Sequence, residues 1–352
     1  MSSDTGRATV TNLEAVSFAR RSKTWDQLAG VRRKPSEYEV VSHNLNYHFN
    51  RADAPFELDP SAPLNAWYLR YREGSPLRVD DWNEFRDPSK LTYRTYVEQQ
   101  SRRETYLDGV VDRYEADAHR CDFSREWIET LSRSYLTSRY SCHVLQMVAM
   151  YLAQISPASY ITNCAEFQAG DEMRRIQRMA YRAKALADGF NDPALGESKT
   201  ARTIWETDEA WQPLRECLEQ LLVAYDFGEA FVALNLCVKP MHDGLMITEL
   251  ARVAQGAGDE ELALVLGDFD LDSARSREWS SALARYAIDR APENRELIAS
   301  WIQRWQPQAK RGIDALAHVV APENGLDRIQ RRVRDAHEAF LSGCGLSGVG
   351  AG

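Results

Sequence analysis

The chain has 352 residues and is 44% hydrophobic, which is enough to bury one large or two smaller cores and argues against wholesale disorder. Its formal net charge of -9 disfavours a general nucleic-acid binder. The nearest approach to a membrane span, residues 144–155, is too short and contains Gln146 and Gln154.

Residues 1–90 are predicted to form an extended, irregular N-terminal arm. Repeated prolines prevent long helices there, and the many aromatic side chains would be costly to leave in water. Such a segment covers a surface of its own chain or of a partner, and we expect the larger share of its apolar surface to contact a partner. The candidate interface residues are Trp67, Tyr68, Tyr71, Trp82 and Phe85.

Residues 91–342 are predicted to form an all-α domain, because the apolar spacing is helical and no alternating strand pattern of useful length is present. Ser124 or Asp122 is a candidate N-cap for the second helix. The glycine-rich residues 343–352 are predicted to be a flexible tail. The expected helices cover residues 93–116, 124–135, 142–155, 160–188, 203–225, 228–255, 259–285, 292–305 and 310–342.

Two segments of this domain look like altered copies of one metal-binding motif, Asp-Glu-x-Arg-His. They are Asp171-Glu172-Met173-Arg174-Arg175 and Asp272-Ser273-Ala274-Arg275-Ser276. In the intact motif the glutamate and the histidine lie one helical turn apart on one face, where both can bind the same iron ion. The first copy has Arg175 in the histidine position, and the second has Ser273 and Ser276 in both ligand positions. A guanidinium has no lone pair for iron, and serine hydroxyls replace carboxylate and imidazole poorly.

A ferritin-like di-iron site also needs a carboxylate roughly thirty residues ahead of each motif. Cys142 and Lys239 stand at these two places, within a residue or so, and neither is a carboxylate. Of six presumed ligand positions only Glu172 retains a ligand type. The sequence therefore predicts a ferritin-like helical bundle that has lost its metal, with no catalytic or cofactor-binding residue of its own. A lone buried glutamate is unfavourable, so we expect Arg175 and Lys239 to pair with Glu172.

Both motif copies retain their aspartate and arginine: Asp171 and Arg174 in the first, Asp272 and Arg275 in the second. In an intact motif such residues do not bind the metal, but they hydrogen-bond to the metal ligands and orient them. We expect a crossed network in which Asp171 binds Arg275 and Asp272 binds Arg174, with bidentate arginine–carboxylate geometry.

Three further segments carry a family resemblance. They are residues 34–41 (Lys-Pro-Ser-Glu-Tyr-Glu-Val-Val), the aromatic stretch 67–77, and residues 82–94 with Trp-Asn-Glu-Phe-Arg-Asp-Pro at their start. Over residues 30–340 the chain resembles the β subunit of the hydroxylase component of bacterial multicomponent di-iron monooxygenases. The similar branch is the one that oxidises toluene, isoprene and small alkenes.

The resemblance implies a non-catalytic subunit without a cofactor, which pairs with a homologous di-iron α subunit and a small γ subunit in a dimer of αβγ units. It also implies an effector protein, a Rieske-type ferredoxin and an NADH-dependent reductase acting on the complex. The hydrocarbon substrate would be set by the α subunit. Six cysteines without disulfide-like spacing and an N-terminus without the apolar core of a signal peptide favour a cytoplasmic location.

Two other classes of function remain open from the sequence. The first is a self-sufficient ferritin-like metalloprotein with an atypical site built from Glu172, Asp171 and Asp272. The second is a regulatory binding protein unrelated to oxidation. Bound iron in the chain expressed alone would favour the first of these alternatives over a metal-free subunit.

Overall fold

A computed structural model describes residues 28, 33–43, 61–116, 123–321 and 324–349, and the regular secondary structure of these residues is entirely helical. The all-α prediction is therefore confirmed. The first part of the chain contains α1 (Glu37–Ser42), α2 (Pro63–Tyr68), a π-helical turn (Leu69–Glu73), a 3-10 turn (Trp82–Glu84), α3 (Tyr93–Ala116), α4 (Arg125–Arg133), α5 (Arg139–Ile155) and α6 (Ser159–Phe190).

The second part contains α7 (Pro193–Gly196), α8 (Ser198–Thr207), α9 (Gln212–Leu221), α13 (Glu260–Arg290), α14 (Asn294–Val320) and α15 (Leu326–Gly343). Between α9 and α13, one continuous helix of alternating type runs from residue 227 to 256. It consists of α10 (Phe227–Phe231), a π-helical segment (Val232–Val238), α11 (Lys239–Asp243), a second π-helical segment (Gly244–Glu249) and α12 (Leu250–Gly256).

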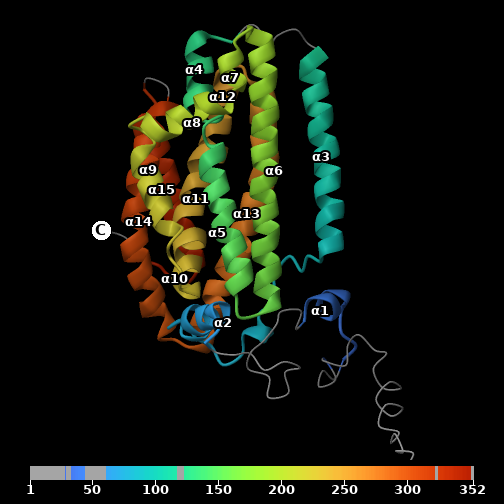
Figure 1. The fold of residues 1–352 in the computed structure, drawn as a ribbon, viewed down its shortest axis with the longest axis vertical. Helices are drawn as coiled ribbons and strands as arrows, with labels where there is room; N and C mark the ends of the chain where they lie inside the picture. The colour runs from blue at the N-terminus through green and yellow to red at the C-terminus, as the bar shows by residue number, and fades with distance from the viewer. Residues whose placement is uncertain (1–27, 29–32, 44–60, 117–122, 322–323, 350–352) are drawn as a thin grey trace, which may run out of the picture.

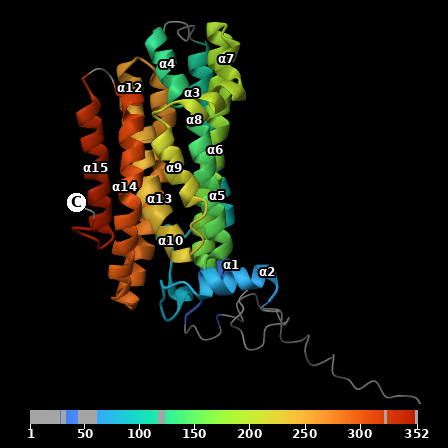
Figure 2. The same ribbon diagram turned by 60° about the vertical axis from the view of Figure 1, so that its left-hand side comes forward.

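The long helices run side by side along the longest axis of the molecule (Figures 1 and 2). Helix α6 packs along α5, and α13 packs along α6 and the 227–256 helix. Helix α3 lies outside this group and contacts α13. The fully buried side chains between the helices include Leu145, Ala149, Leu234, Leu250, Phe269, Ile302 and Leu316. Four helices, α5, α6, α13 and the 227–256 helix, thus surround the interior that holds both motif segments.

Local signals explain several helix ends. The Ser124 hydroxyl accepts a hydrogen bond from the Trp127 N–H at 3.1 Å and caps α4, as predicted. Asp259 caps α13 in the same way through the Leu262 N–H. Helix α6 ends at Phe190 and is followed by Asn191, whose positive φ of 49° is the left-handed conformation that ends many helices.

Some predicted boundaries are wrong. The sequence interpretation divided the chain near Pro307, but α14 continues through this proline to Val320. A proline removes one backbone hydrogen bond, and packing on both sides of α14 keeps the helix intact despite that loss. Residues 203–225 form two helices rather than one, because α8 ends at Thr207 and α9 begins at Gln212. Helix α4 ends at Arg133, two residues before the predicted end.

The described part of the arm is less extended than predicted, because it contains α1, α2 and two short helical turns beneath the bundle (Figures 1 and 2). Phe85 is 2% exposed and packs against the ring of Tyr286 at 5.8 Å. Its prediction as a partner-interface residue is therefore wrong, because the chain's own core covers it. The flexible-tail prediction is also wrong for residues 344–349, where Cys344 and Leu346 are fully buried; residues 350–352 lie outside the described part.

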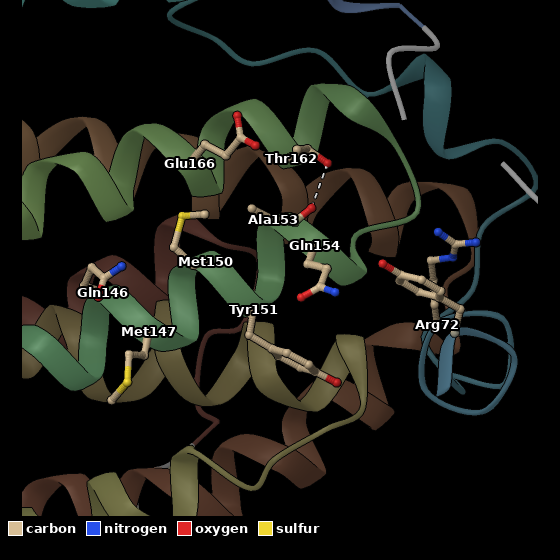
Figure 3. A pocket seen from close by; sticks show the side chains of 10 residues that line it. Arg72, Gln146, Met147, Met150, Tyr151, Ala153, Gln154, Thr162 and Glu166 are labelled. Atoms are coloured by element: carbon tan, nitrogen blue, oxygen red, sulfur yellow. Dashed lines mark hydrogen bonds between the residues drawn. The ribbon is translucent and has the colours of Figure 1, made fainter. Parts of the chain in front are cut away.

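The other four candidate interface residues, Trp67, Tyr68, Tyr71 and Trp82, are partly buried against the chain's own core. The indole N–H of Trp67 donates to the hydroxyl of Tyr151 on α5 at 3.0 Å, and the rings of Trp82 and Phe227 lie 5.7 Å apart. The arm and the bundle also enclose a surface cleft of about 670 Å³ (Figure 3). Met147 and Met150 from α5 line this cleft and are partly exposed. The described part of the arm is thus packed against this chain and still presents apolar surface.

Candidate functional site

The first motif segment lies in a cluster of buried charges at the centre of the bundle. Glu172 and Arg175 come from α6, and Lys239 and Asp243 come from α11. Each of these four side chains is at most 3% exposed. The expected contacts of Glu172 are present, because Lys239 Nζ donates to its Oε1 and Arg175 Nη1 lies 3.1 Å from the same atom.

Both cations of this cluster bind the same two carboxylates. Lys239 Nζ, besides its contact with Glu172, lies 2.8 Å from Asp243 Oδ2. Arg175 Nη1, besides its contact with Glu172, lies 2.8 Å from Asp243 Oδ1. The two positive groups therefore share two bridging carboxylates, and the formal charges sum to zero. We call Glu172, Arg175, Lys239 and Asp243 the charge cluster.

Ser273, from the second motif segment on α13, completes the hydrogen bonding of the charge cluster. Its hydroxyl accepts from Arg175 Nη2 at 2.8 Å and donates to Asp243 Oδ2 at 2.7 Å. The side chain in the second glutamate position thus connects α13 to both α6 and α11. This connection uses a neutral hydroxyl, which adds no further charge to the buried site.

Electrostatics within the charge cluster favour the ionised forms. Burial opposes ionisation of Asp243, but the charges of Arg175 and Lys239 outweigh it and hold its pKa well below the usual range. Burial also opposes the charge on Arg175, and Asp243 and Glu172 outweigh that effect and raise its pKa. For the nearby thiol of Cys142 on α5, burial first and then the charge of Glu172 raise the pKa, which favours the neutral thiol.

Asp243 was missed by the sequence interpretation, which expected a carboxylate only near residue 239. Its signal was the spacing of four residues from Lys239, which places both side chains on one face of a helix. Cys142 lies in the buried core, and within the described residues it makes no hydrogen bond to the charge cluster.

Ser276, the other predicted ligand position on α13, belongs to a separate uncharged layer one helical turn away. Its hydroxyl donates to Oε1 of Gln168 at 2.8 Å. The same oxygen accepts from Asn235 Nδ2 at 2.8 Å and from the indole N–H of Trp279 at 3.2 Å. Because an indole N–H can only donate, Trp279 fixes which end of the Gln168 amide faces this layer. Gln168 and Asn235 were also missed, since no motif marks them.

The retained aspartates and arginines form the predicted crossed pairs. Arg174 Nη1 lies 2.9 Å from Asp272 Oδ2, and Arg275 Nη2 donates to Asp171 Oδ2. The expected bidentate geometry is wrong, because Arg174 uses its remaining nitrogens for other carboxylates, Asp268 on α13 and Glu104 on α3. Arg174 therefore connects α6 to both α13 and α3, whereas Arg275 connects α13 to α6.

Helix α3 joins this outer network through polar side chains. Gln100 Nε2 donates to both Asp171 and Asp272 at 3.0 Å, and Arg103 Nε lies 3.0 Å from Asp268 Oδ1. Burial, together with the neighbouring charge of Asp272, raises the pKa of Asp171 to about 6, although Arg275 acts in the opposite direction. Burial and the charge of Asp272 thus oppose the ionisation of Asp171, and Arg275 favours it.

The residues of the bundle interior do not fit a di-iron centre. The two side chains that meet both carboxylates, Lys239 and Arg175, carry positive charge and offer no lone pair to a metal. Within residues 28, 33–43, 61–116, 123–321 and 324–349, no three His, Cys, Asp or Glu side chains are grouped so that they could hold a metal ion.

The same described residues include no helix that is long and apolar enough to cross a membrane.

Comparisons with known proteins give consistent matches. The profile of a family described as methane/phenol/alkene hydroxylase matches residues 67–291. The hydroxylase component subunit beta of the toluene-4-monooxygenase system of Ectopseudomonas mendocina is 40% identical over 310 residues, which cover 87% of this chain and 94% of that protein. An oxygenase component of phenol 2-monooxygenase from Pseudomonas sp. strain CF600 is 25% identical over 318 residues. The match covers 88% of this chain and 90% of that protein.

A solved structure of toluene 4-monooxygenase, with toluene bound in its resting active site, contains a chain of the same fold. The TM-score is 0.80 at 39% sequence identity, and the match covers 85% of this chain and 98% of that one.

Proposed function

The chain belongs to the methane/phenol/alkene hydroxylase family, and we propose that it is the iron-free β subunit of a hydroxylase whose di-iron centre lies in a homologous α subunit. The observation that carries this proposal is the charge cluster. Where a ferritin-like enzyme needs metal ligands, this chain has two cations bridging two carboxylates. The chain therefore retains the helical bundle, and ion pairs take the place of metal ligands in its interior.

The proposed complex is a multicomponent monooxygenase that inserts one atom of dioxygen into a hydrocarbon, using electrons from NADH. The α subunit would supply the iron chemistry and select the substrate, an aromatic compound, isoprene or another alkene. This chain would contribute a scaffold. Its rigidity is supported by the crossed pairs Arg174–Asp272 and Arg275–Asp171, which join α6 to α13 from opposite directions.

The proposed partners are the α subunit, a small γ subunit and a second αβγ protomer, with an effector protein and a Rieske-type ferredoxin acting on the complex. Trp67, Tyr68, Tyr71 and Trp82 remain candidates for the α interface, because they are only partly buried by this chain. The nearby cleft lined by Met147 and Met150 adds adaptable apolar surface at the same end of the bundle (Figure 3). We place the complex in the cytoplasm, which suits the five buried free cysteines of the described residues.

Iron analysis tests this proposal against the self-sufficient alternative. The chain is produced alone and together with the α and γ subunits. The α subunit is expected to be encoded nearby with two intact Asp-Glu-x-Arg-His motifs. We expect iron only in preparations that contain α, and a single αβγ-containing species by light scattering.

The matched variant is Glu172→Gln. Stoichiometric iron in the chain alone, lost in Glu172→Gln, would instead support a metalloprotein with a site around Glu172. Failure of the chain to associate with α would reject the scaffold proposal in favour of a separate binding protein.

A further inference from the structure

The uncharged layer beside the charge cluster contains two buried polar atoms that need partners. Within the residues that the structure describes, neither Nε2 of Gln168 nor Oδ1 of Asn235 has a hydrogen-bond partner, and both atoms are shielded from solvent. The two side chains are each 2% exposed. Because an unpaired donor or acceptor in a protein interior is costly, two of them in adjoining amides require an explanation.

The Gln168 amide cannot remove the problem by exchanging its oxygen and nitrogen. Its Oε1 accepts from the Ser276 hydroxyl at 2.8 Å and from the Trp279 indole N–H at 3.2 Å. After an exchange, the NH2 group would face the indole N–H, which can only donate. The observed orientation is therefore the favourable one, and it leaves Nε2 of Gln168 as a free donor.

The Asn235 amide is fixed in the same way. Its Nδ2 donates to Gln168 Oε1 at 2.8 Å and to Ser280 Oγ at 2.9 Å. The Ser280 hydroxyl uses its only hydrogen to donate to the Ser276 carbonyl at 2.6 Å, so it must accept from Asn235. Turning this amide would place its Oδ1 against Gln168 Oε1, and two acceptors repel each other. Oδ1 of Asn235 therefore remains a free acceptor.

The second motif segment provides room for a small ligand in this layer. Ser276 stands in its histidine position, and a serine side chain has several heavy atoms fewer than a histidine side chain. The Ser276 hydroxyl contacts the Gln168 amide directly, so the volume that an imidazole would fill borders this amide. A buried water molecule needs only a small polar space with two to four polar partners.

We propose that this layer binds ordered internal water, which accepts a hydrogen bond from Gln168 Nε2 and donates one to Asn235 Oδ1. The chemistry of the two atoms selects the ligand. A cation would suit Oδ1 but would be repelled by the NH2 hydrogens, and an anion would suit the NH2 group but would be repelled by Oδ1. Water is uncharged, and it both donates and accepts. The inference concerns this chain alone and does not depend on the identity of its partners.

A high-resolution crystal structure of the full-length chain, alone or with its partner subunits, tests the proposal directly. We expect electron density for water at about 2.5–3.2 Å from both Gln168 Nε2 and Asn235 Oδ1. Absence of density at either atom, or direct pairing of either atom with a protein group, would overturn the proposal. Anomalous scattering from the density would identify an ion instead and would also overturn it.

A variant tests the same site in solution. Asn235→Leu replaces the amide by an apolar side chain of similar volume and removes the free acceptor. Oxygen-17 relaxation dispersion detects water that stays inside a protein longer than the tumbling time, and we expect less such water in Asn235→Leu than in the wild type. Asn163 is the matched control, because it is only partly buried and its Nδ2 donates to Ser42 at 3.1 Å.

Asn163→Leu should leave the amount of long-lived water unchanged. Equal amounts in the wild type and Asn235→Leu, or an equal decrease in both variants, would overturn the proposal. If Asn235→Leu does not fold, the wild-type crystal structure alone decides between the outcomes.

Discussion

Arg174 Nη1 on α6 lies 2.9 Å from Asp272 Oδ2 on α13, and the arginine of the α13 motif returns the contact by binding Asp171 on α6. Each motif therefore supplies the partner for the other. Two opposed ion pairs of this kind resist both sliding and rotation of one helix along the other. The retained halves of the two motifs thus have a structural use in this chain that requires no metal.

The crossed pairs should be energetically coupled. In a double-mutant cycle with Arg275→Met and Asp171→Asn, we expect a coupling free energy of unfolding between about 1 and 3 kcal/mol, because both side chains are largely buried. The same cycle at Arg215 and Glu219, an exposed pair within α9, should give only about 0.3–0.5 kcal/mol. Urea unfolding of the wild type and the six variants measures both values. Equal coupling in the two cycles would contradict a stabilising role for the crossed network.

Removing one cation from the charge cluster should be costly. Lys239→Met leaves two carboxylates with one positive partner in a dry site, and we expect a loss of about 3–5 kcal/mol in the free energy of unfolding. Lys310 is the matched control, since it also binds an aspartate four residues later at 2.8 Å but is 41% exposed. Lys310→Met should change stability by less than about 1 kcal/mol. Similar losses in both variants would mean that Lys239 is not effectively buried.

Two leucines of the arm should separate folding from assembly. Leu77 is 2% exposed and Leu64 is 56% exposed. Leu77→Ala should lower the free energy of unfolding of this chain by about 2–5 kcal/mol through cavity formation. Leu64→Ala should leave stability within about 0.5 kcal/mol of wild type and weaken association with the α subunit. Unfolding and co-purification assays measure the two effects, and unchanged assembly in Leu64→Ala would remove α2 from the proposed interface.

The arm should also lose stability in acid. Both oxygens of Glu39 accept from Arg33, at 2.7 and 2.9 Å, and these hydrogen bonds lower the pKa of Glu39 from 4.5 to about 2 against the opposing effect of burial. A carboxylate with a lowered pKa contributes stability above its unfolded pKa and loses it as the pH falls through the folded value. The contribution is therefore complete above pH 4.5 and disappears towards pH 2.

The difference in unfolding free energy between wild type and Glu39→Gln should follow this profile. Its size should be on the order of 1 kcal/mol, because Arg33 is 65% exposed and solvent screens the pair. Glu37→Gln, a change at an exposed neighbour in the same helix, is the control. A difference that does not vary between pH 5 and pH 2 would argue against ionisation of Glu39 as the cause.

The helical fold and the main contacts of the motif residues could be predicted from the sequence, because helical spacing determines which side chains share a face. The pairing of Glu172 with Lys239 and both crossed pairs follow from this geometry. Asp243 was missed although its spacing from Lys239 places both on one helix face, since no motif marks it and its role depends on how α11 packs against α6. The course of α14 through Pro307 was missed for a related reason, as tertiary packing outweighed a local helix-breaking signal.

For Phe85 in the arm, the sequence interpretation had the right chemistry and the wrong surface. Composition shows that aromatic side chains need cover, but it does not show which molecule provides it. For Phe85 the cover is Tyr286 and the remaining core of this chain. For Trp67 and Trp82 the cover is partial, and the rest of their surface remains available.

The formal neutrality of the charge cluster limits how this protein can evolve. A neutral replacement at Glu172, Arg175, Lys239 or Asp243 leaves one uncompensated charge among side chains that are at most 3% exposed. Single neutral replacements are therefore costly at these four positions, whereas exchanges within one charge type, or paired removal of one cation and one carboxylate, preserve the balance. Descendants of this sequence are expected to inherit the charge balance of the four positions, so a return to metal binding would require several simultaneous substitutions.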